Sequence, residues 1–84
     1  MAQTLLNIGF ENAIVRNRVV GIASSESAPV KRLIQEAKVS GRLVNVASGR
    51  RVKSVIFTDT NQIFLSSLAA ATLNQRWSES SESR

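Results

Sequence analysis

One segment of the sequence has a clear helical period, and it limits the possible folds more than any other feature. Between Ser27 and Gly41, four apolar residues recur at positions i, i+3, i+4 and i+7, which places them on one helical face. Ser27 is a suitable N-cap, Pro29 is tolerated in a first turn, and Gly41 suits the C′ position after a helix. The sequence therefore predicts one amphipathic helix, with the apolar face Val30, Leu33, Ile34 and Ala37.

Short runs rich in apolar and β-branched residues lie on both sides of this helix, and each has the composition of a strand. The last three runs follow one another with short connections, which favours an antiparallel arrangement. A turn at Ser48 and Gly49 is expected to join two of them as a hairpin. A closing helix is expected over residues 69–77, with Leu73 and Trp77 among its core contacts. The expected strands cover residues 4–8, 18–23, 42–47, 52–58 and 62–68.

The chain has 84 residues, which is enough for one small domain with a modest core. Its elements predict an α+β fold, in which a small, mostly antiparallel sheet carries one amphipathic helix on a face and a short C-terminal helix. Residues 1–77 are expected to form this domain, and the polar segment 78–84 a disordered tail. Because so small a core gives limited stability, assembly into an oligomer is a common remedy.

The absence of cysteine and histidine excludes several classes of function. It rules out a disulfide framework, thiolate chemistry and a Cys/His zinc site, and it removes the most common general base. No acidic pair has metal or acid–base spacing, and no Gly-rich phosphate loop is present. We therefore expect no enzyme activity, metal, cofactor or small-molecule substrate, although a Ser-Lys arrangement stays open. Without a secretory signal or a long apolar run, the expected location is the cytoplasm, with no membrane partner.

The charge of the chain is the most informative part of its composition. Eleven Lys and Arg stand against six Asp and Glu, a net charge of +5. Residues 16–53 alone hold nine basic residues and two acidic ones, a net charge of +7. A basic domain without catalytic residues indicates a polyanionic partner, and nucleic acid is the main candidate. The alternative is that the charge serves only solubility.

Arg50 and Arg51 are the first candidate contacts, because they follow the Gly49 turn with Lys53 close behind. A guanidinium suits phosphate because its planar fork bonds two oxygens at once. The alternative interpretation is a solvated hairpin tip, since turns are usually polar. Phe10 is the aromatic residue nearest the basic segment, and with so few aromatics a stacking platform for single strands is not expected.

Three further cations belong to the candidate set. Arg16 and Arg18 lie at the entry of the second expected strand and would point to one side if the segment were extended. Charges that protect an edge strand from aggregation are the alternative reading of this pair. Lys31 lies near the start of the predicted helix, where its charge opposes the helix dipole, so a partner is plausible there.

Several motifs resemble those of the RemA family of bacterial extracellular matrix regulatory proteins. They occur in one order along the chain and span residues 7–67, whereas the segment after Leu68 matches poorly. The motifs are NIGF at 7–10, SAPVKRLIQEA at 27–37, SGRLV at 40–44, GRR at 49–51, VIFTD at 55–59 and LSS at 65–67.

The resemblance implies a DNA-binding transcriptional regulator that assembles into a ring-like homo-oligomer, of seven or eight subunits or a multiple. In that family, the arginines of the Gly-Arg-Arg turn and one at the start of the second strand contact DNA. At the matching positions this chain has Arg50, Arg51 and Arg18. Arg16 departs from the family pattern and widens the candidate set.

The sequence hypothesis is therefore an oligomeric regulator that binds double-stranded DNA at the nucleoid. Arginines repeated around the assembly would contact the DNA backbone and the minor groove. Two alternatives stay open at this point: an RNA-binding module, and a scaffold oligomer that binds no nucleic acid. The candidate DNA contacts are Arg16, Arg18, Lys31, Arg50, Arg51 and Lys53.

Overall fold

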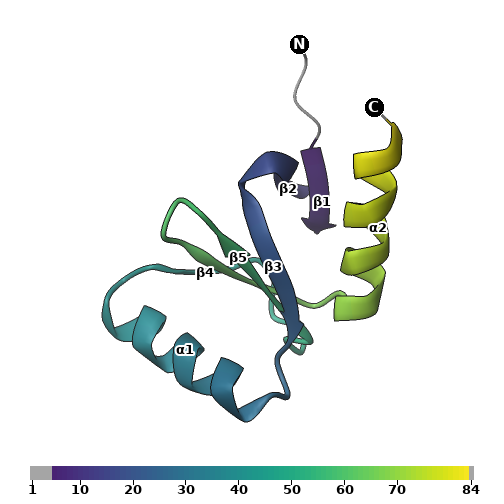
Figure 1. Ribbon diagram of the computed structural model, residues 1–84. Helices are drawn as coiled ribbons and strands as arrows, with labels where there is room; N and C mark the ends of the chain where they lie inside the picture. Colours follow the sequence, from purple (N-terminus) through teal and green to yellow (C-terminus); the bar gives the residue numbers. More distant parts are fainter. Residues whose placement is uncertain (1–4, 84) are drawn as a thin grey trace.

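The computed structural model describes residues 5–83, and for residues 79–83 it describes the backbone only (Figure 1). Two helices and six strands form the described chain, with one 3₁₀ turn, η1, before the third strand. In order, the elements are β1 (Leu5–Gly9), β2 (Asn12–Val15), η1 (Arg16–Arg18), β3 (Val19–Ser24), α1 (Ala28–Val39), β4 (Leu43–Asn45), β5 (Ser54–Thr58), β6 (Ile63–Ser66) and α2 (Ala70–Ser83). The α+β class predicted from the sequence is confirmed.

The central sheet has four strands in the order β3-β5-β6-β4. β5 pairs antiparallel with β3 on one side and with β6 on the other, whereas β4 pairs parallel with β6. β1 and β2 form a separate antiparallel hairpin. The sheet is therefore mostly antiparallel, with β3 and β4 at its edges.

Both faces of this sheet are covered, which gives three layers (Figure 1). α1 packs on one face, and the β1–β2 hairpin packs on the other together with α2, which lies beside β1. Successive residues of a strand point to opposite faces, so Val55 of β5 contributes to the α1 side and Ile56 to the hairpin side. Neither described helix is long and apolar enough to cross a membrane.

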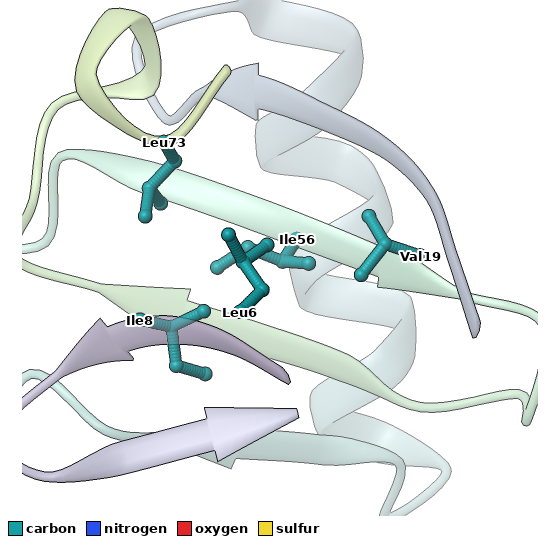
Figure 2. Packing of buried hydrophobic residues seen from close by; sticks show 5 residues of the cluster. All are labelled: Leu6, Ile8, Val19, Ile56 and Leu73. Atoms are coloured by element: carbon teal, nitrogen blue, oxygen red, sulfur yellow. The ribbon is translucent and has the colours of Figure 1, made fainter. Parts of the chain in front are cut away.

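The core on the hairpin side joins elements that are distant in sequence (Figure 2). Leu73 attaches α2 to this core and Trp77 packs at its margin, as the sequence predicted, and Leu68 packs there too. The buried residues of this cluster are Leu6, Ile8, Val19, Ile56 and Leu73. The cluster on the α1 side consists of Val30, Ala37, Val55, Ile63 and Leu65.

The amphipathic helix predicted from the period is confirmed as α1. Its end is a Schellman motif, in which the Arg42 N–H donates to the Ala37 carbonyl and the Gly41 N–H to the Lys38 carbonyl, at 2.9 and 3.3 Å. Ser27 occupies the N-cap position, but its side chain makes no capping hydrogen bond. The predicted apolar face was too wide by one residue, because Leu33 is 42% exposed.

Replacing Gly41 with alanine should lower the free energy of unfolding by about 1 kcal/mol, because Gly41 has φ +75° and a Cβ disfavours that conformation. No atom lies within 4 Å of the added Cβ, so the loss measures backbone strain alone. Urea unfolding monitored by circular dichroism measures it. Gly21→Ala is the matched control, because Gly21 has no positive φ and its Cβ would meet Phe57 at 4.0 Å. Equal losses for both variants would contradict the assigned role of Gly41.

The hairpin expected around Gly49 is wrong. β4 and β5 are not neighbours, because β6 lies between them, and β4 runs parallel to β6. Residues 46–53 therefore form a crossing loop rather than a hairpin tip. Residues 59–61 do join an antiparallel pair, β5 and β6, as the short connection between these two expected strands favoured.

Three other expectations also differ from the structure. β2 was not predicted, and residues 16–18 form the turn η1 rather than extended chain. α2 runs to Ser83, beyond the expected end of this helix at residue 77, and the disordered tail expected over residues 78–84 stays a prediction. Thr4 of the first expected strand and Arg84 of the expected tail lie outside the described residues.

Candidate nucleic-acid interface

The crossing loop, residues 46–53, is held against the end of β6 by backbone hydrogen bonds. The Val46 N–H donates to the Leu65 carbonyl at 2.9 Å, and the Lys53 N–H donates to the Ser66 carbonyl at 2.8 Å. The Ser25 N–H in turn donates to the Lys53 carbonyl at 3.1 Å. Both ends of the loop are therefore fixed to the sheet, and its middle projects beyond it.

The middle of the loop is a tight turn that presents two arginines to solvent. Ser48 and Gly49 both have positive φ, at +58° and +82°. The Arg50 N–H closes the turn by donating to the Ala47 carbonyl at 3.1 Å. Arg50 and Arg51 follow directly and are both exposed. The turn at Ser48 and Gly49 is confirmed, although its place in the sheet was predicted wrongly.

A pocket of about 550 Å³ lies where this loop meets the β1–β2 turn and the chain that leaves β6. Its wall combines apolar groups with the cationic ends of three side chains. The Arg50 guanidinium carbon lies 5.3 Å from the centre of the Phe10 ring. The lining residues are Gly9, Phe10, Arg50, Arg51, Lys53, Ser67 and Leu68.

A second pocket, of about 440 Å³, places the start of α2 next to Arg51 and Lys53. Ala69 precedes the helix, and the Leu73 N–H donates to its carbonyl at 3.1 Å. Alanine has no side-chain acceptor, so it cannot cap the first N–H groups of α2, and the first turn contains no acidic residue. The partial positive charge of the helix start therefore adds to the two cations.

Two arginines of the candidate set form ion pairs in the free chain. Arg51 Nη2 lies 3.3 Å from Glu26 Oε2, and Arg18 Nη1 lies 3.5 Å from Asp59 Oδ2. All four side chains are at least 43% exposed. Exposed pairs of this kind contribute little to stability, so another anion can displace the carboxylate at little cost.

The structure separates the predicted cations into groups. Arg50, Arg51 and Lys53 come together at one end of the sheet. Arg18 lies at the other end of β3, where the Asp59 N–H donates to its carbonyl at 2.9 Å. β3 has six residues, so the two groups are about 20 Å apart along the strand.

Arg16 and Lys31 have different surroundings from the other cations. The expectation that Arg16 and Arg18 share one side of an extended strand is wrong, because both lie in η1. Arg16 is half-buried, and its Nε is buried without a hydrogen-bond partner among the described residues. Lys31 is exposed in the first turn of α1 and lines neither of the two pockets.

Sequence reasoning missed the carboxylates and the helix start that complete this site. Glu26 and Arg51 are 25 positions apart, and Asp59 and Arg18 are 41 positions apart. No local pattern in the sequence indicates pairs at such separations. The same holds for the start of α2, which reaches the loop only because of the sheet order.

Comparison with known proteins identifies relatives over almost the whole chain. A family model described as RemA-like, extracellular matrix regulatory protein A-like, matches residues 5–77. A protein of Oleidesulfovibrio alaskensis is 48% identical over 75 residues, which is 89% of each chain. One of Halothermothrix orenii is 45% identical over 78 residues, 93% of each chain. Both carry the name "Putative regulatory protein", which describes regulation rather than catalysis.

Proposed function

Because the chain belongs to the RemA-like family of bacterial regulatory proteins, we propose that it regulates transcription by binding double-stranded DNA. One observation carries this proposal: Arg50, Arg51 and Lys53 converge with the uncapped start of α2 at one end of the sheet. A DNA-binding role implies that the protein acts at the nucleoid, in the cytoplasm.

The chemistry of this convergence suits a phosphate backbone. Arg51 has a side chain that is 79% exposed, so its guanidinium can bond two phosphate oxygens with little desolvation. The first N–H groups of α2, which no side chain of the described residues is seen to cap, add donors and a favourable dipole for the same anion. Arg18, about 20 Å away at the far end of β3, supplies a second contact zone on the same subunit.

A single subunit has too few of these contacts for tight binding, so we include a ring-like homo-oligomer in the proposal. Repetition of the site around an assembly would make later contacts intramolecular, which raises the effective concentration of each site. Sequence preference would then come from the shape and bendability of DNA, with arginines in a narrow, AT-rich minor groove.

The experiment that tests the proposal is fluorescence anisotropy with a labelled AT-rich duplex, at salt concentrations from about 50 to 200 mM. We expect binding whose log K falls steeply with log salt, because each neutralised phosphate releases counterions. Unlabelled duplex RNA of equal length should compete less well than duplex DNA. Better competition by RNA would identify an RNA-binding module. An absence of DNA binding near 150 mM salt would contradict the proposal and favour a scaffold oligomer that binds no nucleic acid.

Glu26→Gln should tighten DNA binding about two- to fivefold, because the free protein then no longer pairs Arg51 with a carboxylate. Anisotropy titration at fixed salt measures the change. Glu36→Gln is the matched control, since it removes the same charge from an exposed position on α1. An equal gain for both variants would assign the effect to net charge and contradict a specific competition at Arg51.

A further inference from the structure

Arg50 differs from Arg18 and Arg51 in what holds its side chain. Arg18 and Arg51 each face a carboxylate, whereas the guanidinium of Arg50 lies over the Phe10 ring at 5.3 Å. We propose that Phe10 is a positioning residue, which holds Arg50 in place for the DNA contact of the proposed function on which this inference rests. The face of the Phe10 ring attracts the cation without neutralising it.

The difference between a carboxylate and a ring matters for binding. A carboxylate occupies the N–H donors of an arginine and must be displaced before phosphate binds. A ring attracts the cation through its quadrupole and does not pair with its N–H donors as a carboxylate does. Arg50 has no hydrogen bond or ion pair from its side chain to any described residue, so its donors are available to a phosphate.

Phe10 is fixed by the turn that carries it. Phe10 and Glu11 both have positive φ, at 52° and 63°, which is uncommon for residues with large side chains. Asn12 stabilises this conformation, because its side-chain amide donates to the carbonyls of Gly9 and Phe10, each at 3.1 Å. A strained turn that is held in this way indicates a function for the residue it presents.

Ser66 connects the turn that carries Phe10 to the loop that carries Arg50. Its buried hydroxyl donates to the Ile8 carbonyl at 2.7 Å, and its carbonyl accepts the Lys53 N–H at 2.8 Å. Gly9, with φ +114°, lies directly against Leu68 in the chain that leaves β6. The ring and the guanidinium are therefore positioned relative to the same segment of the sheet.

The exposure of Phe10 is also consistent with this role. Phe10 is 46% exposed and belongs to neither of the two core clusters, so burial in the core does not explain an aromatic residue here. Packing against Arg50 restricts that long side chain before DNA arrives. Less side-chain freedom is then lost on binding, which strengthens the contact.

The test is a double-mutant cycle on DNA binding with Phe10→Leu and Arg50→Ala. Phe10→Leu keeps an apolar side chain at the same positive φ but removes the ring, and it should weaken binding about two- to fivefold. In the Arg50→Ala background the same change should have no further effect, because Phe10 acts through Arg50. Phe10→Tyr keeps the ring and should bind like the wild type. An equal loss in both backgrounds, or no loss in either, would overturn the positioning role.

A measurement without DNA separates this inference from the proposed function. The side-chain protons of Arg50 should show an upfield ring-current shift in the NMR spectrum of the wild type, and Phe10→Leu should abolish it. Identical Arg50 resonances in the two proteins would overturn the contact between the guanidinium and the ring itself. If the wild type binds no DNA, both proposals fail, whereas DNA binding that is insensitive to Phe10→Leu overturns only the positioning role. Thermal unfolding of each variant confirms that it is folded.

Discussion

Alanine at both Arg50 and Arg51 should weaken binding to an AT-rich duplex about 100-fold for each subunit that contacts it, or about tenfold for each lost phosphate contact. The two guanidiniums lie together on a turn whose ends are hydrogen-bonded to the sheet, so their loss removes contacts without disturbing the core. The slope of log K against log salt should also become less steep, by about 1.8 for two phosphates per subunit. Anisotropy titrations across a salt series give both quantities.

The control for this prediction is Arg32→Ala/Lys38→Ala, which removes the same charge from exposed positions on α1. We expect this pair to lower the affinity much less, since it leaves the loop and the start of α2 intact. Light scattering establishes whether both proteins keep the wild-type assembly size. Equal losses of affinity in the two double variants would show that net charge, and not a local interface, determines binding.

The sequence predicted the elements that depend on local signals. α1 is the clearest case, because its apolar period and its terminal Gly41 are both encoded within 15 consecutive positions. The φ of +75° at Gly41 is what a C′ glycine is expected to adopt. The α+β class followed from one such helix among short β-branched runs.

The strand order could not be predicted in the same way. A short connection favours pairing between consecutive strands, yet β4 and β5 are separated by β6. β4 has only three residues, and its parallel partner β6 begins 20 positions after it, so nothing local indicates the pair. β2 could not be predicted either, because the turn before it lacks the usual Asn-Gly signal. That turn has Phe10 and Glu11 at positive φ instead.

For the candidate site, the sequence indicated the charged residues but not their surroundings. Charge and turn composition identified Arg50, Arg51 and Lys53, and these three residues do come together. Their surroundings depend on the sheet order, which places Phe10 and the start of α2 beside them. Sequence can therefore indicate which residues carry charge at such a site, whereas the packing of distant segments determines what holds each of them.

Replacing Ile56 with alanine should lower the free energy of unfolding by about 2–5 kcal/mol, the usual range for a large apolar side chain in a core. Ile56 is fully buried in the central strand β5, and its cluster joins β1, β3 and α2 (Figure 2). The whole stability of an 84-residue domain is about 4–13 kcal/mol, so this one change can remove a large share of it. Urea unfolding monitored by circular dichroism measures the loss.

The comparison variant is Val20→Ala, in the neighbouring strand β3, where the side chain is 62% exposed. We expect it to cost less than about 1 kcal/mol, since little buried surface is lost. Both variants should be unfolded at several protein concentrations, because subunit association would make the apparent stability depend on concentration. A loss at Ile56 no larger than that at Val20 would contradict the packing of α2 and the β1–β2 hairpin on this face. A larger loss at Ile56 would support it, and with it the placement of the start of α2 beside Arg51 and Lys53, which depends on that packing.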